Sequence, residues 1–271
     1  MGLIVGLDIG GTTTKIIGYE NGDLLGFVRV IASDPFTSAS GGLGKFLNVI
    51  GRNLSHVEHI HATGVGASQL SGELFGCPTK VVPEFDCVGL GGLYLTGLDR
   101  AIVVSMGTGT SIVAARGRQV AHVIGSGVGG GTLQGLAKRM LNFQDFGTIS
   151  KFAEKGDLGM VDLTIGDITT ADIPGLTPEA TASNFGKMED LAEVQDIAAG
   201  IVNLVFQSVG TASVLAARLE CIDKIVITGN LSQMSFGKFI LDGFSRLYNV
   251  SFYIPEHADF ATAIGASLID G

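Results

Sequence analysis

Two turns rich in glycine and threonine carry the residues of this chain that are best suited to phosphate chemistry. Residues 8–15 read Asp-Ile-Gly-Gly-Thr-Thr-Thr-Lys, and residues 107–111 read Gly-Thr-Gly-Thr-Ser. Glycine lets the backbone approach an anion closely, while threonine hydroxyls and backbone amides donate hydrogen bonds to phosphate oxygens. Lys15 adds a positive charge, and Asp8 has the carboxylate that suits a magnesium ion or its bound water. Each turn separates two apolar runs, so the pattern predicts two strand–turn–strand units with a nucleotide clamped between two related lobes.

A third glycine-rich segment, residues 125–131, precedes a helix that we expect to begin at Thr132. The unpaired amides and the positive dipole end of a helix N-terminus favour a phosphate group. An ordinary glycine-rich connection is the alternative interpretation. Because the two threonine-containing turns point to the same chemistry, we favour a third phosphate-binding loop.

Glu84 is the candidate general base. It follows a strand predicted over residues 79–82, at the kind of strand end where open α/β sheets build their sites. A carboxylate there can accept the proton of an attacking hydroxyl group. In the alternative interpretation, Glu84 and Asp86 are solvated acids on either side of a core phenylalanine, and Asp86 caps the next helix.

Several histidines and cysteines invite a metal or disulfide interpretation, which their spacing does not support. His56, His59 and His61 have no further ligand at a recognisable spacing, so we expect an exposed strand rather than a metal site. The 3 cysteines are isolated in the sequence and form no Cys-X-X-Cys pair. This pattern argues against a disulfide framework or a zinc site and favours a reducing compartment.

The composition is that of a compact globular protein with an excess of acidic residues. Of 271 residues, 46% are hydrophobic and 16% are charged, and the net charge is −9. Nucleic acid or an anionic membrane surface requires the opposite field, so we expect neither as a partner. The uncharged stretch 197–217 contains several polar side chains, which favours a buried helix between the lobes over a membrane span. The N-terminus begins with a strand pattern rather than a signal peptide, and we expect a cytoplasmic protein.

We expect a first lobe over residues 1–98. Apolar runs separated by the first glycine–threonine turn and the Asn21-Gly22 turn predict a three-stranded antiparallel meander, followed by helices and strands that extend the same sheet. The predicted strands are 3–7, 15–19, 24–30, 58–63 and 79–82, and the predicted helices are 42–54, 67–75 and 87–96. The last of these helices is rich in glycine and other small residues, which indicates close packing against another backbone.

The second lobe, residues 99–271, repeats the same pattern. Residues 149–187 are more polar and irregular than their surroundings, and we expect an insertion there. The predicted strands are 101–106, 111–115, 120–124, 224–228 and 250–253, and the predicted helices are one that begins at 132 and those over 188–219, 236–247 and 258–269.

The two turns and the glycine loop together resemble the actin-like ATPase superfamily of sugar and acid kinases. Four stretches look like the type II pantothenate kinases within it: residues 8–15, 84–86, 107–111 and 129–136. Residues 173–177 (Ile-Pro-Gly-Leu-Thr) and 182–186 (Ala-Ser-Asn-Phe-Gly) are similar to that family's connection into its long helix, which other actin-like kinases lack. The tail at residues 260–266 also fits, so the resemblance covers essentially the whole chain.

The resemblance implies an α/β fold of the two-lobed actin-like ATPase type, related to ribonuclease H, with duplicated mixed sheets and helices around an ATP cleft. It implies ATP-dependent phosphorylation of pantothenate to 4'-phosphopantothenate, the first step of coenzyme A biosynthesis, by a magnesium-dependent homodimer. Glu84 falls on the family's general base, and Asp8 falls where Mg²⁺ is held. The implied ATP contacts are Asp8, Ile9, Gly10, Gly11, Thr12, Thr13, Thr14, Lys15, Thr108, Gly109, Gly130, Gly131, Thr132, Leu133 and Gln134, with Phe146 and Asn230 near the adenine and the ribose.

One position departs from the family pattern. The family places an arginine just before the glycine loop, where it meets pantothenate, and the aligned residue here is His122. Arginine is an always-charged fork of donors, whereas histidine offers one or two donors and a charge that depends on pH. Arg116 and Arg118 lie upstream, and the sequence leaves open whether either reaches the site. Two alternatives also stay open: a kinase of this fold that acts on another small hydroxy compound, and a non-catalytic nucleotide-binding regulator.

Overall fold

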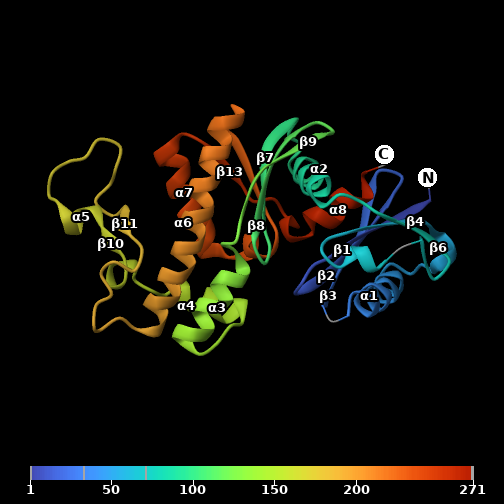
Figure 1. Cartoon of the computed structure of the whole chain (residues 1–271), viewed down its shortest axis with the longest axis horizontal. Helices are drawn as coiled ribbons and strands as arrows, with labels where there is room; N and C mark the ends of the chain where they lie inside the picture. Colours follow the sequence, from blue (N-terminus) through green and yellow to red (C-terminus); the bar gives the residue numbers. More distant parts are fainter. Residues whose placement is uncertain (1, 33, 71, 270–271) are drawn as a thin grey trace.

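The computed structural model describes residues 2–32, 34–70 and 72–269, and two of its β-sheets flank a pair of packed helices (Figure 1). The first sheet has six strands in the order β3-β2-β1-β4-β6-β5. Its strands are β1 (Leu3–Ile9), β2 (Thr13–Glu20), β3 (Asp23–Ile31), β4 (Val57–Thr63), β5 (Gly72–Leu74) and β6 (Cys77–Val81). β1 and β2 are antiparallel, whereas β4 runs parallel to β1. Helix α1 (Pro35–Val49) packs on β1, β2 and β3.

The second sheet has five strands in the order β13-β12-β7-β8-β9. Its strands are β7 (Arg100–Met106), β8 (Thr110–Arg116), β9 (Gln119–Ser126), β12 (Lys224–Thr228) and β13 (Ser251–Tyr253). β7 and β8 are antiparallel, and β12 runs parallel to β7. In both sheets a parallel strand therefore lies beside the first strand of a strand–turn–strand unit. This repeated arrangement confirms the duplication predicted from the two turns.

Two helices, α2 (Glu84–Thr96) and α8 (Ala261–Ser267), lie between the sheets (Figure 1). α2 packs on β7, β8 and β9 of the second sheet, whereas α8 packs on β1, β2 and β4 of the first. Their backbones touch: a Cβ atom built on Gly91 would lie 1.8 Å from the Ala261 carbonyl oxygen, and one on Gly265 would lie 1.8 Å from that of Cys87. The close backbone packing predicted for the glycine-rich helix is confirmed. The division into lobes at residues 98 and 99 stays a prediction, since α2 packs on the sheet that follows it in the chain.

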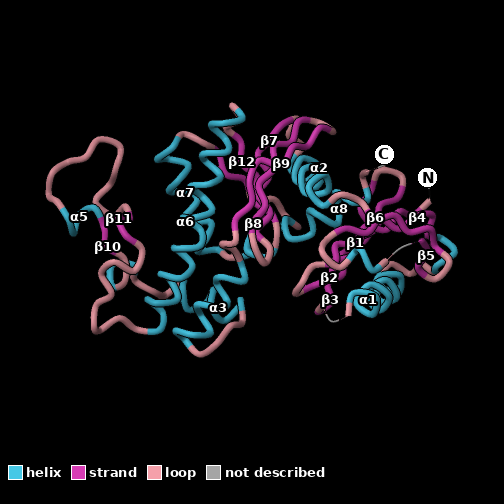
Figure 2. Tube along the Cα trace, viewed as in Figure 1, coloured by secondary structure: helices cyan, strands magenta, loops and turns pink. Residues whose placement is uncertain are grey.

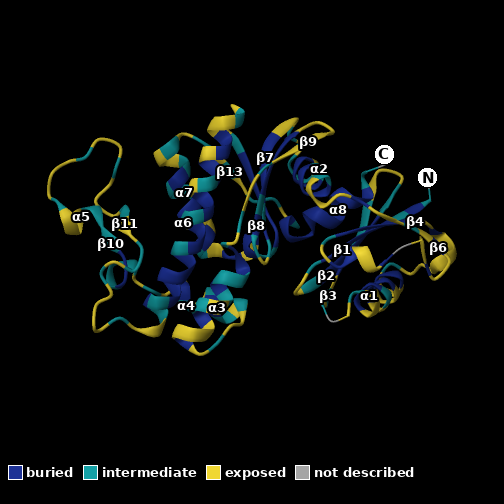
Figure 3. Cartoon of the chain, in the orientation of Figure 1, coloured by how far each residue is buried: buried dark blue, intermediate teal, exposed yellow. Residues whose placement is uncertain are grey.

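The longest helix, α6 (Val194–Glu220), lies at the centre of the hydrophobic core on the side of the second sheet. By length and apolar composition it resembles a membrane span, and it is the one helix among the described residues that does so. Most of it is buried, as expected for a core helix (Figure 3). It packs with α3 (Gly130–Leu141), α4 (Phe146–Ala153) and α7 (Ser235–Tyr248). The expectation of a buried helix is confirmed, but its predicted position between the lobes is wrong, because α2 and α8 occupy that place.

Several predicted helix starts are wrong because local capping fixes them elsewhere. α1 begins at Pro35, since Asp34 accepts a hydrogen bond from the Thr37 amide and proline suits the first helical position. α6 begins at Val194 rather than residue 188, because the Asp196 carboxylate accepts a hydrogen bond from the Glu193 amide at 2.8 Å. α2 begins at Glu84, three residues earlier than predicted.

The helix predicted over residues 67–75 is also wrong. Residues Ala67–Gln69 form a single 3₁₀ turn, and Gly72–Leu74 form β5, which pairs with β6. Phe75 and Gly76 both have positive φ angles, and this turn geometry sends the chain back as a hairpin. Residue 71 lies outside the described residues.

The predicted insertion contains a small sheet of β10 (Leu163–Thr164) and β11 (Thr181–Ser183), with the short helix α5 (Ile165–Ile168). It projects beyond α6, and loops make up much of it (Figure 2). The fully buried Asp162 carboxylate anchors it by accepting hydrogen bonds from the Phe185 amide at 2.8 Å and from the Asn203 side chain of α6 at 2.6 Å.

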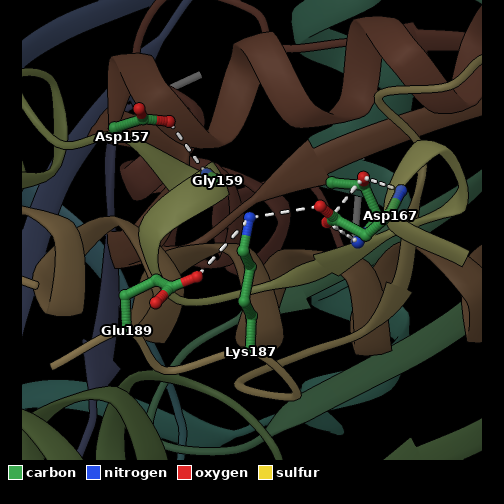
Figure 4. Close-up of polar contacts among 6 residues, drawn as sticks. Asp157, Gly159, Asp167, Lys187 and Glu189 are labelled. Carbon is green, nitrogen blue, oxygen red and sulfur yellow. Dashed lines mark hydrogen bonds and ion pairs between the residues drawn. The ribbon is translucent and has the colours of Figure 1, made fainter.

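A second set of polar contacts joins α5 to the segment that leads out of this insertion (Figure 4). The Lys187 ammonium lies 3.1 Å from the Asp167 carboxylate and 3.9 Å from that of Glu189. The backbone and hydroxyl of Thr164 also donate to Asp167, which holds the pKa of this carboxyl well below its usual range, at about 2. The Asp162 contact with Asn203 therefore ties the insertion to α6, and the Lys187 contact holds α5 to the segment that leads out of the insertion.

Candidate active site

The two glycine–threonine turns face each other across a cleft of about 520 Å³. The first turn connects β1 to β2 and the second connects β7 to β8. A Cβ atom built on Gly11 of the first turn would lie 3.8 Å from the Thr108 hydroxyl of the second. The chain thus brings together two phosphate-type turns that are far apart in the sequence, as predicted.

Most of the predicted site residues line this cleft, and the others lie behind it. Those that line it are Asp8, Gly10, Gly11, Thr12, Thr13, Lys15, Glu84, Thr108, Gly109, His122 and Asn230. The predicted residues outside its lining are Ile9, Thr14, Gly130, Gly131, Thr132, Leu133, Gln134 and Phe146. Ile9 and Thr14 alternate with the lining residues along β1 and β2, so their side chains point into the first lobe.

Asp8 and Lys15 form the buried charged pair of the cleft. They are cross-strand partners in β1 and β2, and the Lys15 ammonium lies 3.5 Å from the Asp8 carboxylate. Burial raises the pKa of the Asp8 carboxyl, and the positive charge of Lys15 partly offsets this effect. A buried carboxylate in a cleft is a favourable ligand for a divalent cation, which would stabilise its ionised form. The donor chemistry of Asp8 therefore fits Mg²⁺.

Glu84 is the first residue of α2, directly after the Val82-Pro83 corner at the end of β6, and it is open to solvent through the cleft. Burial by the cleft walls raises its pKa, as does the negative charge of Asp8, while Lys15 acts in the opposite sense. A carboxylate with a raised pKa is a stronger base, which suits the role predicted for Glu84. The capping role considered for Asp86 is wrong, since Pro83 is the N-cap residue of α2.

His122 lies in the same cleft, on β9. Its ring stacks on that of Phe85, with the ring centroids 4.2 Å apart and the planes at 21°. Neither upstream arginine reaches this position. Arg116 donates to the Glu220 carboxylate at 2.8 Å, and Arg118 donates to the carbonyl oxygens of Leu268 and Ile269 beyond α8.

Asn230 follows the glycine turn at the end of β12 and lines the cleft. Its side-chain oxygen is buried and has no hydrogen-bond partner among the described residues. Such an orphan acceptor is costly unless a ligand supplies a donor. Gly229 has φ +85°, and a Cβ atom on it would lie 2.6 Å from the Met106 carbonyl oxygen. The close approach of this turn to β7 thus requires glycine and fixes the position of Asn230.

Comparison with known proteins identifies the family. A sequence model of the Fumble family matches residues 100–269. A type II pantothenate kinase of Bacillus cereus is 30% identical over 97% of this chain and 96% of its own length, and one of Staphylococcus saprophyticus is 26% identical over 97% and 98%. The chain belongs to the type II pantothenate kinase family. The resemblance predicted from the sequence is confirmed.

Solved structures confirm the actin-like fold for this family member. The activator of the 2-hydroxyisocaproyl-CoA dehydratase from Clostridium difficile, solved with bound ADPNP, superposes with a TM-score of 0.72 at 19% identity, over 98% of this chain and 93% of the activator. A ROK hexokinase from Thermus thermophilus superposes with a TM-score of 0.57 at 13% identity, over 98% of both chains. At these identities the likeness shows the fold alone.

In this pantothenate kinase family member the last glycines of the loop back the second turn, whereas Gly125 and Ser126 at its start line the cleft. The Gly130 and Gly131 amides donate to the carbonyl oxygens of Gly107 and Thr108, each at 2.8 Å. A Cβ atom on Gly130 would lie 2.8 Å from the Gly107 oxygen. The glycines therefore let α3, which begins at Gly130 and not at Thr132 as predicted, press against the turn.

The remaining predicted ATP contacts on α3 and α4 are engaged within the second lobe. The Leu133 side chain is fully buried in the core, and the Thr132 hydroxyl donates to the Gly127 carbonyl oxygen at 2.9 Å. The Gln134 amide donates to the Gln144 carbonyl oxygen at 3.2 Å. The Phe146 ring packs behind Gly130, 3.2 Å from the position of a Cβ atom there. The contacts of these residues with ATP stay predictions.

Substituting Gly130 by alanine is expected to weaken ATP binding by about tenfold. The new methyl group must displace the Gly107–Thr108 backbone, at a cost of about 1–3 kcal/mol, and this turn lines the cleft. Gly135→Ala, on the same helix, is the matched control, because a Cβ atom there meets nothing within 4 Å. Calorimetric titration with ATP tests both variants. Equal dissociation constants for wild type and Gly130→Ala would contradict a role for the loop in shaping the site.

Some residues of the cleft were not predicted from the sequence. Gly64, Val65 and Thr262 line it from the end of β4 and from α8. A Cβ atom on Gly64 would lie 2.9 Å from the Oδ1 atom of the Asp8 carboxylate, and the φ angle of Gly64, +89°, favours glycine. The Gly-Val-Gly sequence at residues 64–66 was the available signal, whereas nothing in the sequence brings α8 to the first sheet.

The histidines near β4 have separate structural partners. His56 shares a contact of 2.8 Å with the Asn53 side chain, and the His61 ring makes a hydrogen bond with the Ala266 carbonyl oxygen at 2.9 Å. His59 is exposed as expected, but the prediction is wrong for His61, which is 2% exposed because α8 covers it. Within the described residues, no group of three or more His, Cys, Asp or Glu side chains is arranged to hold a metal ion.

Proposed function

We propose that this protein phosphorylates pantothenate to 4'-phosphopantothenate with ATP. The observation that carries the proposal is the convergence of Asp8, Lys15 and Glu84 on one cleft between two phosphate-type turns. The names of the full-length relatives supply the substrate. We further propose that the protein works in the cytoplasm, as a homodimer and with Mg²⁺.

In this mechanism the Glu84 carboxylate accepts the proton of the pantothenate hydroxyl as its oxygen attacks the γ-phosphorus of ATP. The bond between that phosphorus and the β–γ bridging oxygen breaks, and ADP leaves with the electron pair. The amides and hydroxyls of the two turns, with the Lys15 ammonium, stabilise the charge on the transferred phosphoryl group. When bound, Mg²⁺ would be held by Asp8 and would neutralise phosphate charge.

One observation supports a position for the nucleoside of ATP within the cleft. The unpartnered Asn230 oxygen is a buried acceptor in the cleft, and a ribose hydroxyl or an adenine amino group would supply the donor that it lacks. We therefore place the nucleoside beside β12. The hydroxy substrate then lies toward Glu84 and His122.

A coupled assay of ADP formation tests the function. We expect ATP consumption that depends on pantothenate, and a panel of other small hydroxy acids measures the specificity. A second candidate, a kinase for another hydroxy compound, is favoured by His122 in place of the family arginine. Faster turnover of a different hydroxy compound would establish this candidate, and ATP binding without turnover of any compound would establish the regulatory alternative.

The rate is expected to fall at acid pH because Glu84 must be ionised to act as a base. Its pKa is raised, so the ionised form is lost as the pH falls through a value above the about 4.3 of an ordinary glutamic acid. The acid limb of kcat/KM against pH measures this value in the free enzyme. Circular dichroism over the same pH range controls for unfolding. An acid limb at or below about pH 4.3 would contradict the raised pKa.

Substitution of His122 is expected to affect the hydroxy substrate and leave ATP binding unchanged. His122→Ala removes a donor from the substrate end, which costs about tenfold or more in kcat/KM for an anionic substrate. If pantothenate is the substrate, His122→Arg restores the family's fixed charge and keeps or improves kcat/KM. Steady-state kinetics together with ATP titration separate the two effects. Unchanged kcat/KM in His122→Ala would remove this residue from the substrate site.

A further inference from the structure

The stacked pair of Phe85 and His122 is a feature of the cleft that the phosphoryl-transfer chemistry does not use. Both residues line the cleft, and Phe85 directly follows Glu84. The rings are nearly parallel, at 21°, with centroids 4.2 Å apart. Phe85 is more than one-third exposed, so burial of its ring in a core does not explain this position.

The surrounding backbone places the two rings face to face. One helical turn beyond Phe85, a Cβ atom on Gly89 would lie 2.5 Å from the Val120 side chain, so α2 rests directly on β9 there. Phe85 is four residues before Gly89 on the same helix face, and His122 is two residues after Val120 on the same strand face. A register shift between Ile112 and Val113 marks a bulge in the β8–β9 pairing next to His122. Bulges beside active sites commonly re-aim a side chain.

The charge distribution makes His122 the available donor at this end of the cleft. Among the described residues that line the cleft, the basic side chains are Lys15 and His122, and Lys15 is paired with Asp8. Arg116 and Arg118 are bonded to Glu220 and to the end of the chain beyond α8. No hydrogen bond from a His122 ring nitrogen to another described residue is found, so the ring can serve a ligand.

We propose that Phe85 is a positioning residue that holds the His122 imidazole in the orientation in which a ring nitrogen donates to the acidic end of the hydroxy substrate. Stacking fixes the ring plane of His122, which lines the cleft. The pair thereby determines the preference for a hydroxy acid over a neutral compound of the same skeleton. This inference rests on the proposed function, because it assigns the substrate end of that site.

A double-mutant cycle of Phe85→Leu and His122→Ala tests the proposal. The substrates are pantothenate and its neutral analogue, in which a hydroxymethyl group replaces the carboxylate. Loss of the stack is expected to raise KM for the acid by about 2- to 12-fold, with kcat within about twofold, and to leave KM for the neutral analogue unchanged. Phe85→Tyr keeps the stack and is expected to retain the wild-type KM.

The cycle shows whether Phe85 acts through His122. In the His122→Ala background, Phe85→Leu is expected to have no further effect on KM for the acid. Additive effects of the two substitutions, or an unchanged KM in Phe85→Leu, would overturn the proposal. Calorimetric titration is expected to give the same ATP dissociation constant for all variants, and an altered value in Phe85→Leu would likewise overturn it, because the residue would then act on the cleft as a whole.

A spectroscopic measurement separates failure of the proposal from failure of the proposed function. The ring protons of His122 are expected to show a ring-current shift from Phe85 in the wild-type NMR spectrum, which disappears in Phe85→Leu and returns in Phe85→Tyr. If the wild-type enzyme fails to phosphorylate pantothenate, the proposed function is wrong. The ring-current shift still tests the proposed orientation of His122, because this measurement does not depend on activity. Identical His122 signals in wild type and Phe85→Leu would refute the stack.

Discussion

Replacing Glu84 by glutamine is expected to lower kcat by about 10²- to 10⁴-fold while ATP still binds. Glutamine keeps the shape of the side chain but cannot accept the proton of the attacking hydroxyl group. The acid limb of the pH–rate profile that belongs to Glu84 should disappear from the residual activity. Steady-state kinetics across pH and ATP titration measure these effects.

Asp86→Asn is the matched control for this experiment. Asp86 lies in the same first turn of α2 but not in the lining of the cleft, so its substitution should leave kcat within about threefold of wild type. Near-normal turnover in Glu84→Gln would show that another group accepts the proton.

Replacing Gly91 by alanine is expected to cause the largest loss of stability among the substitutions considered. Its Cβ atom would lie 1.8 Å from the backbone oxygen of Ala261, and rotation of a side chain cannot relieve a clash with backbone. α2 and α8 must then move apart, at a cost of about 3 kcal/mol or more. The melting temperature should fall by about 6–12 °C, as measured by differential scanning calorimetry.

Gly44→Ala is expected to change the stability in the opposite direction. Gly44 lies in α1, where a Cβ atom meets nothing within 4 Å, so alanine should stabilise the helix by about 0.5–1 kcal/mol. Equal melting temperatures for Gly91→Ala and Gly44→Ala would show that the two helices between the sheets do not depend on their backbone contact.

The strands and turns could be predicted from the sequence because their signals are local. Apolar runs and the Asn21-Gly22 turn indicate the β1–β2–β3 meander without reference to the rest of the chain. The start of α1 was missed because its first turns contain small polar residues, so the signal lay in Asp34 and Pro35 rather than in hydrophobic spacing. The 67–75 segment was missed because its hairpin depends on positive φ angles at Phe75 and Gly76.

The candidate site could be predicted where residue type alone carries the chemistry. Asp8, Lys15, Glu84 and His122 lie around one cleft, as their types and the family resemblance suggested. The role of the glycine loop could not be predicted, because the carbonyl oxygens that its amides bind belong to a turn about twenty residues earlier. Whether Arg116 or Arg118 enters the cleft likewise depends on tertiary structure, and their hydrogen bonds to Glu220, Leu268 and Ile269 show that neither does.

The position of α8 has a consequence for the order in which the protein matures on the ribosome. This helix packs on β1, β2 and β4, and a Cβ atom on Gly6 of β1 would lie 2.1 Å from the Ala263 carbonyl oxygen. A nascent chain that has emerged only through α2 therefore contains every strand of the first sheet but lacks the helix that covers one of its faces. Such long-range closure delays completion of the first sheet until the last helix is synthesised, and until then Ile17 and its neighbours are exposed to chaperones.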